Sequence, residues 1–594
     1  MNPKDPLSNV LYIDLTKKRF WIENRRDLFE RWLGGVGVAV KLYEEETTAK
    51  TDPLGPENVI VFAVGPLTGL YPMASKAVAV FKSPLTGNYG ESHAGGRTAV
   101  ALRNSGLGAI VIMGASDKPV WVSIINGKVY FRDASALWGM RSSHTVGRII
   151  REYETYGPGL RSIMRIGRAG EKLVRYACVI TETFRHFGRL GLGAVFGSKK
   201  LKALMIAGKR SIPIANPPEY RKVYVHLHKL SVESDLMKKY HDLGTPMNII
   251  PLNVIGALPT RNLQSSRFEF ADNISGERFA ETKLGRRTAC GMCPVACIHL
   301  AALREPYVDE PYFYKTTFIP YDYEPIYALG SMLGISEPDG ILRLIDTVDT
   351  LGLDAISTGV TLAWATEALK KKVITLNETI VELDWGNYEN YIKAIKFIVQ
   401  QPNDFYKALA KGLAYATKVY GGEDFALTFG GNEMAGYHTG PAAYINFLIG
   451  ARHSHLDSAG YSLDQTLLRK NVKLSPQETV DRLVDEEAWR QILSSLVVCF
   501  FGRKLYNMDN VVEALRPLGY EYDVESLKKL GYGIYFEKYK VKIRDGFNVE
   551  KLKIPNRIFE IPTPHGNLSK EFIEEALRYF KKKWIEGVIL KRTS

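Results

Sequence analysis

Three of the chain's five cysteines lie within eight residues, as Cys290-Gly-Met-Cys293-Pro-Val-Ala-Cys297, and this spacing constrains the fold more than any other feature. Three soft thiolate ligands on one short turn or helix start favour a single inorganic centre, and they are too crowded for ordinary disulfides in a reducing compartment. An iron–sulfur cluster takes four thiolates, so a fourth must come from elsewhere. Cys499, far along the chain in an apolar segment, is the better candidate. Cys178, in the strand-like Tyr176 to Ile180, is expected to be a buried structural thiol.

Other interpretations of this cysteine run stay open on spacing alone. Structural zinc usually shows two CxxC pairs or nearby histidines, and His299 keeps zinc in consideration. A radical-SAM centre uses CxxxCxxC, the reverse of the order found here. Accidental clustering is the last alternative. The spacing favours a [4Fe–4S] centre in an electron-transfer protein, but it does not name a reaction.

The composition is that of an ordinary globular protein. The 594 residues are 45% hydrophobic and 24% charged, which excludes a collagen, a disordered chain and a disulfide scaffold. The length predicts about three to five domains. The formal charge is +14, but the basic residues are spread along the chain in short clusters. Nucleic-acid binders concentrate such charge in blocks or arms, so we expect solvated faces and no nucleic-acid partner.

No segment has the length or composition of a membrane anchor. The densest apolar run, 496–501, is far shorter than the roughly 20 residues that span a bilayer. The first residues lack a basic and then apolar signal, so we expect a cytoplasmic protein without a membrane partner. Only six glutamines occur beside many Lys, Arg and Glu, which hints at a thermophilic source.

The first 210 residues are predicted to be β-rich. A hairpin is expected over 10–15 and 19–23, and another over 120–125 and 128–132, where Asn126-Gly127 forms the turn. Further strands are expected at 59–64, 77–81, 109–113 and 203–207. The proline-rich segment 212–218 is predicted to be a linker.

Helical periodicity follows this linker. Ser336-Glu337-Pro338 predicts a helix start with Ser336 as the cap, and further helices are expected over 360–369 and 482–500. The fold class is therefore α+β and multidomain. An N-terminal β-rich domain of twisted sheets (1–210) is expected to precede two mainly α-helical domains (211–420 and 421–594).

Three glycine-containing loops could bind a cofactor. In 93–97 and 185–193, glycines beside arginines let backbone N–H groups and guanidinium groups approach phosphate oxygens, although each loop fits a plain turn equally well. Neither is a GxGxxG or P-loop motif. In Asp349-Thr-Leu-Gly352-Leu353-Asp354, Gly352 fits a helix C-terminus and Asp354 a cap for the next helix. Alternatively, the two carboxylates accept hydrogen bonds from a polar cofactor ring.

Several motifs in order carry a family resemblance. They are Gly65-Pro-Leu-Thr-Gly69, Lys82-Ser-Pro-Leu-Thr-Gly87, Gly95-Gly96, Gly188-Arg189 through Gly197-Ser198-Lys199, the CxxCxxxC run, Tyr323-Glu324, and Asp349 to Gly359. With these, the chain resembles the tungsten-containing aldehyde ferredoxin oxidoreductases over most of its length. The resemblance implies a tungsten bound by the dithiolenes of two molybdopterin-type pterins, a [4Fe–4S] cluster, and magnesium bridging the pterin phosphates. It also implies oxidation of an aldehyde to a carboxylic acid, with electrons passed to ferredoxin.

The resemblance assigns roles by position. The cluster ligands would be Cys290, Cys293, Cys297 and Cys499. The pterin-cofactor positions would be Lys76, His93, Gly95, Arg185, His186, Gly188, Arg189, Asp349, Leu353, Asp354, Arg452, Asp457 and Ser494. The catalytic positions would be Glu324, His455 and Tyr323. Glu324 would activate water as a general base, and His455 would donate a hydrogen bond to the substrate carbonyl. Without the resemblance, Glu324 fits a paired carboxylate and His455 a structural histidine.

This chain departs from the family pattern at several positions. Lys76 replaces an arginine, His93 an asparagine and Asp457 a lysine. The second Asp-x-x-Gly-Leu-Cys motif reads Ser494-Ser-Leu-Val-Val-Cys499. A subunit-bridging Glu-x-x-His motif becomes Arg343-Leu-Ile-Asp346, so no bridging iron is expected. A homodimer and a heteromer with a small iron–sulfur subunit both stay open.

Two other functions remain compatible with the sequence. One is a related bispterin enzyme that reduces carboxylic acids or aromatic rings, and the other is a non-catalytic iron–sulfur electron-transfer subunit. Segments 311–321 and 436–447 are expected to wall the substrate pocket. Ferredoxins are typically acidic, so the +14 charge favours their attraction. The sequence does not specify the aldehyde, and pterin dithiolenes bind molybdenum as well as tungsten.

Overall fold

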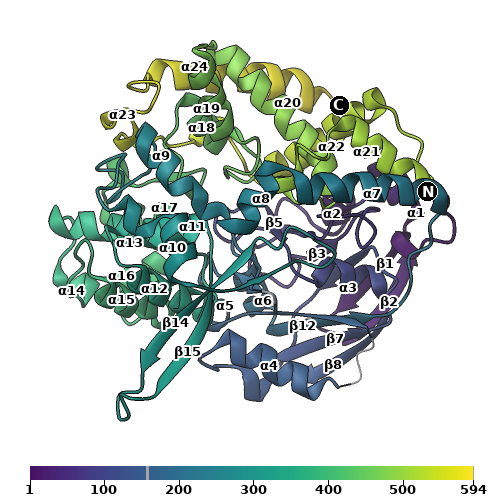
Figure 1. Cartoon of the computed structure of the whole chain (residues 1–594), viewed down its shortest axis with the longest axis horizontal. Helices are drawn as coiled ribbons and strands as arrows, with labels where there is room; N and C mark the ends of the chain where they lie inside the picture. Colours follow the sequence, from purple (N-terminus) through teal and green to yellow (C-terminus); the bar gives the residue numbers. More distant parts are fainter. Residues whose placement is uncertain (156–158, 183, 593–594) are drawn as a thin grey trace.

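A computed structural model describes residues 1–155, 159–182 and 184–592 (Figure 1). Its N-terminal part contains two six-stranded sheets. The first has the order β2-β1-β6-β3-β4-β5, from strands β1 (Asn9–Asp14), β2 (Arg19–Asn24), β3 (Ile60–Ala63), β4 (Ala77–Lys82), β5 (Tyr89–Ala94) and β6 (Ala109–Met113). The second has the order β11-β10-β9-β12-β7-β8, from β7 (Val120–Ile125), β8 (Lys128–Asp133), β9 (Leu160–Arg165), β10 (Val179–Ile180), β11 (His186–Phe187) and β12 (Leu201–Gly208).

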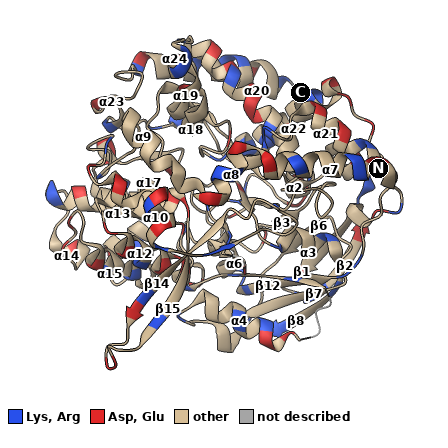
Figure 2. Cartoon of the chain, viewed as in Figure 1, with Lys and Arg blue, Asp and Glu red and all other residues tan. Residues whose placement is uncertain are grey.

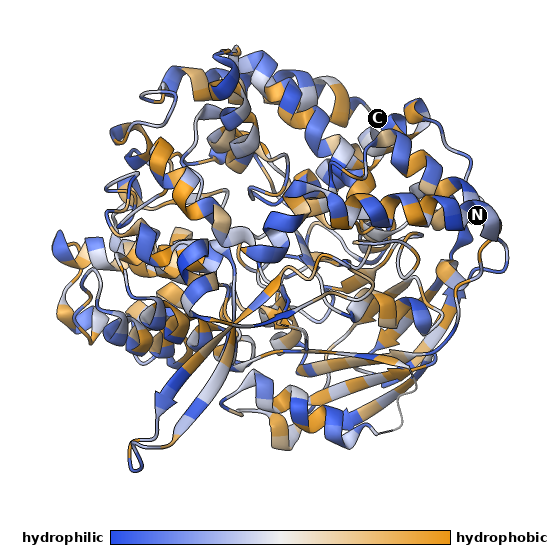
Figure 3. Cartoon of the chain, viewed as in Figure 1, coloured by the Kyte–Doolittle hydropathy of each residue, from blue (hydrophilic) through white to orange (hydrophobic). Residues whose placement is uncertain are grey.

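Both predicted hairpins are confirmed, because β1 pairs with β2 and β7 with β8 in antiparallel register. Asn126 and Gly127 have φ values of 51° and 82°, as the turn between β7 and β8 requires. The strands of these sheets are largely apolar (Figure 3). Helix α2 (Gly35–Glu46) packs on β3 and β4, and α3 (Thr98–Asn104) packs on β9 and β12.

The helical part corrects several predicted boundaries. Helix α12 (Pro338–Leu351) has Glu337, not Ser336, at its N-cap, and α13 (Ala355–Lys370) begins earlier than predicted because Asp354 caps it. Helix α20 (Pro476–Ser495) ends before Cys499. The predicted linker ends early, since Asn216 caps α7 (Pro217–Glu233) and the prolines form its first turn.

A small three-stranded sheet interrupts the helical part. Its strands β13 (Leu284–Thr288), β14 (Ile298–Pro306) and β15 (Tyr314–Tyr321) are adjacent in that order. The segment 290–297 is therefore the loop between β13 and β14, not the start of a helix. Beyond the body of the molecule β14 and β15 continue as a two-stranded ribbon, which projects at the lower left of Figure 1.

The C-terminal segment packs back against the N-terminal sheets. Ile492 and Leu496 around the end of α20, and Ile534 of α22 (Val524–Arg544), belong to the same hydrophobic core as strands β1 to β6. This packing brings Cys499 beside the N-terminal part of the chain. The exact division into 1–210, 211–420 and 421–594 stays a prediction. Within the described ranges, no helix combines the length and apolarity needed to cross a bilayer.

Candidate active site

A cavity of about 360 Å³ lies where the N-terminal sheets meet the helical part. Most of the predicted site residues line its wall. They are the four cysteines Cys290, Cys293, Cys297 and Cys499, with Lys76, His93, Gly95, Arg185, His186, Gly188, Arg189, Glu324, Asp349, Leu353, Asp354, Arg452 and His455. The fold therefore brings together residues that are more than 400 positions apart in the sequence.

Backbone hydrogen bonds hold the two cysteine segments in place. The N–H of Gly291 donates to the carbonyl of Gly96 at 2.7 Å. The N–H of Cys499 donates to the carbonyl of Met73 at 2.9 Å, and the N–H of Lys76 to that of Val497 at 3.1 Å. The cysteine loop and the fourth cysteine are thus both fixed to the segment that carries Lys76 and Gly95.

The surroundings of the thiols fit an iron–sulfur cluster. Burial raises the pKa of Cys293 to about 12 and raises that of Cys297 further, so an isolated thiolate is disfavoured there. Burial alone would lower the pKa of Lys76, but the nearby Cys499 and Cys290 outweigh it and raise this pKa. A cation beside the thiols favours the thiolate form that a cluster binds.

Gly95 leaves room for Cys290. A Cβ atom at position 95 would lie 2.7 Å from the Cys290 Sγ atom and 3.3 Å from the Lys76 Nζ atom. Within the described ranges, no three His, Cys, Asp or Glu side chains are placed to hold a single metal ion.

Several polar atoms of cavity-lining residues lack hydrogen-bond partners among the described residues. Nη1 of Arg189 and Oδ2 of Asp349 are buried and have no hydrogen-bond partner among the described residues. His186 Nε2 lies 3.3 Å from Asp349 Oδ1 without hydrogen-bond geometry. Buried polar groups are rarely left unsatisfied, so these atoms fit the hydrogen bonds of a polar cofactor such as a pterin.

The remaining groups of Arg189 and Asp354 have structural partners. Arg189 donates from Nε to Asp354 Oδ2 at 3.1 Å and from Nη2 to the carbonyl of Glu433 at 2.7 Å. Gly352 ends α12 with φ of 80°, and Asp354 caps α13 by accepting from the N–H of Ile356 at 3.0 Å. Both structural interpretations of this motif are confirmed, and the same residues also border the cavity.

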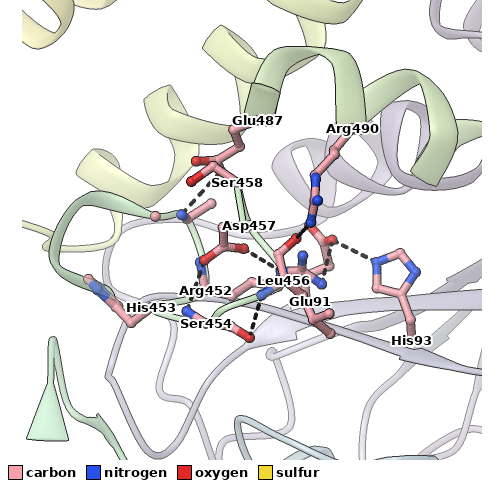
Figure 4. Close-up of polar contacts among 12 residues, drawn as sticks. Glu91, His93, Arg452, His453, Ser454, Leu456, Asp457, Ser458, Glu487 and Arg490 are labelled. Carbon is pink, nitrogen blue, oxygen red and sulfur yellow. Dashed lines mark hydrogen bonds and ion pairs between the residues drawn. The ribbon is translucent and has the colours of Figure 1, made fainter. Parts of the chain in front are cut away.

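A buried network of charges underlies the cavity on the β5 side (Figure 4). Glu91 Oε1 lies 2.7 Å from His93 Nε2 and 3.5 Å from Arg452 Nη1, and its Oε2 lies 2.5 Å from Lys538 Nζ. Arg452 donates from Nε to Asp457 Oδ1 at 2.6 Å. Burial disfavours ionised Glu91, but Lys538 and Arg452 outweigh it and hold the Glu91 pKa well below its usual range.

Glu324, His455 and Tyr437 lie in contact with one another at the cavity. Glu324 lies in the first turn of α11 (Tyr323–Leu329), with its Oε1 atom 3.4 Å from His455 Nε2. The Tyr437 hydroxyl donates to the same oxygen at 3.1 Å. Burial alone would raise the pKa of Glu324, but His455 outweighs it and lowers this pKa. His455 Nδ1 has no hydrogen-bond partner among the described residues.

Three predicted site residues do not border the cavity. Tyr323 is buried behind it, where its hydroxyl donates to the carbonyl of Gly436. Asp457 lies behind Arg452, which it orients. Ser494 lies in the last turn of α20, and its carbonyl would be 2.4 Å from a Cβ on Gly35.

The expected substrate walls differ from those observed. Of segments 311–321 and 436–447, only Pro320 lines the cavity, because β14 and β15 lead away from it and 441–449 form helix α18 (Pro441–Ile449). Residues that the sequence interpretation missed include Glu91, Asp322 and Asn432. The alternation Glu91-Ser-His93 on one strand was the available signal, since residues two apart share a face.

Comparisons with known proteins cover nearly the whole chain. The model of the aldehyde ferredoxin oxidoreductase N-terminal domain matches residues 10–208, and that of domains 2 and 3 matches residues 222–593. The tungsten-containing aldehyde ferredoxin oxidoreductase of Thermococcus kodakarensis is 33% identical over 589 residues, covering 95% of this chain and 94% of that protein. The enzyme of the same name from Pyrococcus furiosus is 31% identical over 586 residues, with 95% and 94% covered.

A solved structure supports the fold independently. The active site complex BamBC of benzoyl coenzyme A reductase with 1,5-dienoyl-CoA matches with a TM-score of 0.82 and 22% identity, over 97% of this chain and 94% of that one. At that identity the likeness concerns the fold alone. With both family models and the two curated relatives covering nearly all of its length, the chain belongs to the family of tungsten-containing aldehyde ferredoxin oxidoreductases.

Proposed function

We propose that this chain oxidises an aldehyde to a carboxylic acid at a tungsten–bispterin centre and passes the electrons through a [4Fe–4S] cluster to ferredoxin or a small iron–sulfur subunit. The observation that carries the proposal is the placement of Glu324 and His455 on the same cavity as four cysteines. An acid–base pair and a redox-cluster site on one cavity suit coupled proton and electron transfer.

The chain's residues divide into cluster ligands and pterin ligands. Cys290, Cys293, Cys297 and Cys499 would bind the cluster. The cations Lys76, Arg185, Arg189 and Arg452 would bind pterin phosphates together with a magnesium ion, and Asp349 would accept hydrogen bonds from a pterin ring. When bound, the tungsten–pterin centre would accept two electrons from the substrate and the cluster would pass them on one at a time.

Glu324 would act as the general base. Its lowered pKa keeps the carboxylate ionised near neutral pH, so it can take a proton from a water molecule beside the substrate. Tyr437 orients this carboxylate, because its hydroxyl donates to Oε1 from behind. Tyr437 is buried and the Glu324 side chain is 25% exposed, so only a small part of this pair meets bulk water.

His455 would polarise the substrate. The protonated imidazole carries two N–H groups. Its Nε2–H points toward Glu324, and its Nδ1–H can donate to the aldehyde oxygen. A hydrogen bond to that oxygen stabilises the negative charge that develops as water attacks the carbonyl carbon. The oxidation releases two protons with the two electrons: Glu324 would take the proton of the attacking water, and the proton of the aldehyde C–H bond would leave to solvent.

Substrate comparison tests this assignment. Anaerobic assays should show aldehyde-dependent reduction of a viologen dye, with a higher kcat/KM than acid reduction by a reduced dye. A chain that reduces acyl or aromatic substrates but does not oxidise aldehydes would instead be a bispterin reductase. A chain that binds iron but releases no fluorescent pterin on acid treatment would be a non-catalytic electron-transfer subunit.

A further inference from the structure

A second cavity, of about 590 Å³, borders the helical part of the chain. Its wall includes residues of α17 (Leu413–Tyr420), of the hairpin formed by β16 (Thr428–Phe429) and β17 (Asn432–Glu433), and of the segment 546–555 that follows α22. Small-molecule sites have volumes of about 300–1,000 Å³, so this space is large enough for one ligand. Among the described residues, none lines both this cavity and that of the candidate active site.

Packed residues divide the two cavities. Gly430 and Gly431 form the hairpin turn with φ values of 56° and 89°, and a Cβ atom on Gly430 would lie 2.2 Å from the His453 ring. Asn432 donates from Nδ2 to the carbonyl of Arg452 at 2.9 Å. Asn432 and Arg452 line the candidate active site, whereas Gly430 and His453 line the second cavity. A ligand in the second cavity would therefore be additional to those of the active site.

Two lysines of the second cavity have no ionic partner within the part of the chain that the structure describes. Charged residues of both signs are interspersed along the helices (Figure 2), and a lysine such as Lys370 pairs with a carboxylate, that of Asp384. By contrast, the side chains of Lys418, in the last turn of α17, and Lys551 form neither an ion pair nor a hydrogen bond with any described residue. Both are exposed, so their ammonium groups are available to an anion.

The carboxylates on the same wall already have partners. Glu423 accepts from Lys553 Nζ at 2.7 Å, and Asp424 accepts from Asn556 Nδ2 at 2.9 Å. The two unpaired lysines therefore give the wall an excess of positive charge, which favours an anion over a cation. A ligand with a single negative charge suits this wall better than a multiply charged one, because Glu423 and Asp424 would repel further negative charge.

Apolar side chains and one unpartnered hydroxyl complete the wall. The apolar residues include Leu85, Phe547, Leu552, Ile554 and Pro555. Thr428 Oγ1 is buried and has no hydrogen-bond partner among the described residues, so it is a further donor for a polar ligand group. Cations, a free hydroxyl and apolar surface in one cavity fit a ligand that has both an anionic group and a hydrocarbon part.

We propose that the second cavity binds a monocarboxylate with an apolar tail, its carboxylate held by Lys418 and Lys551 and its tail packed on the side chains around Phe547. A carboxylate accepts charge-assisted hydrogen bonds from ammonium groups, and burial of the tail removes apolar surface from water. The proposed reaction yields compounds of this class, but the site itself does not depend on that reaction.

Calorimetric titration of the purified full-length chain with hexanoate tests the site. Hexanol has the tail without the charge and inorganic phosphate the charge without the tail, so each should bind at least about 10-fold more weakly than hexanoate. The double variant Lys418→Ala/Lys551→Ala should also bind hexanoate at least about 10-fold more weakly, because both charged hydrogen-bond donors are removed. Lys528→Ala changes an exposed lysine that lines neither cavity, so this control should bind hexanoate as the wild type does.

Acylation of lysine amines, followed by peptide mass spectrometry, locates the bound carboxylate on the wild-type chain. Saturating hexanoate should slow the acylation of Lys418 and Lys551 and leave that of Lys528 unchanged. Absence of hexanoate binding, equal binding by the wild type and the double variant, or protection of neither cavity lysine overturns the proposal. Equal affinity for phosphate or for hexanol overturns it as well, because the site would then recognise any anion or only an apolar group. Neither measurement uses turnover, so a failure of aldehyde oxidation would be a separate result.

Discussion

Nε2 of His455 lies 3.4 Å from Oε1 of Glu324, although the two residues belong to different parts of the helical region. The pair borders the same cavity as the four clustered cysteines. Its two members are a carboxylate with a lowered pKa and an imidazole whose Nδ1 atom has no hydrogen-bond partner among the described residues. In the proposed function they would provide a base and a hydrogen-bond donor within a single contact.

Replacing the base should remove most of the activity. Glu324→Gln keeps the shape and the contact with Tyr437 but cannot accept a proton, so kcat should fall by about 10²–10⁴-fold. Steady-state reduction of a viologen dye by aldehyde measures this loss. Iron and tungsten contents equal to those of the wild type would show that the site remains loaded. Wild-type kcat in this variant would exclude Glu324 as the base.

The pH dependence should report the Glu324–His455 contact. The Glu324 pKa is lowered in the folded protein, so the carboxylate is ionised above its usual value of 4.5 and activity should fall only below it. In His455→Gln the contact that lowers the Glu324 pKa is lost, while the burial that raises this pKa remains. The acidic limb of the pH profile of kcat/KM should therefore move to higher pH. An unchanged limb in this variant would mean that a different group controls the rate at low pH.

Two variants can show whether Cys499 or Cys178 is the fourth ligand of the cluster. Cys499→Ser should lose iron and the low-temperature paramagnetic signal of the reduced cluster, because one thiolate is removed. Cys178→Ser is the matched control, since this buried thiol donates to the carbonyl of Leu353 at 3.5 Å and lies in the opposite wall. Its iron content should match the wild type. Equal iron loss in both variants would refute the assignment of Cys499.

Iron incorporation should depend on the space around Cys290 as well as on its thiol. Gly95→Ala places a Cβ atom 2.7 Å from Cys290 Sγ, so the loop must shift and iron incorporation should fall. Gly533→Ala is the control, because its Cβ would meet nothing closer than Trp32 at 3.6 Å. Iron analysis after anaerobic purification compares the two. Full iron content in Gly95→Ala would show that the loop tolerates the extra methyl group.

The buried Glu91 network should contribute to stability. Lys538→Met removes one of the buried cations beside Glu91 and leaves its carboxylate only Arg452 and His93 as ion-pair partners, which should cost up to about 3–5 kcal/mol in the free energy of unfolding. Because the folded pKa of Glu91 is lowered, its contribution is present above the unfolded pKa and is lost as pH falls through the folded one. Denaturant unfolding at neutral and acidic pH measures this, with the exposed Lys528→Ala as a control of little effect. Equal losses of unfolding free energy in Lys538→Met and Lys528→Ala would contradict this role of the Glu91 network.

Much of the fold follows from local patterns in the sequence. Apolar runs between turn residues located β1, β3, β4, β6 and β7, and Asn126-Gly127 located a hairpin, because these signals act within a few residues. Strand β5 escaped prediction because Glu91 and His93 place polar side chains in a buried strand, where they serve the charge network. Propensity cannot identify a strand whose pattern is set by a binding site.

The site was predictable where chemistry is local and unpredictable where it is assembled by tertiary packing. The cysteine spacing indicated Cys290, Cys293 and Cys297 directly, and elimination indicated Cys499. Lys538 reaches Glu91 from α22, and no pattern near either residue marks the contact. The same limit applies to Tyr437, whose hydrogen bond to Glu324 depends on how a distant loop packs against the first turn of α11.

The most direct test of the proposed function is metal analysis combined with an activity assay on one preparation. The chain, produced anaerobically with tungstate and molybdate both supplied, should contain about four irons and about one tungsten, and should reduce a viologen dye only when aldehyde is added. Iron with neither tungsten nor molybdenum, and no aldehyde-dependent reduction after reconstitution, would contradict the proposed function.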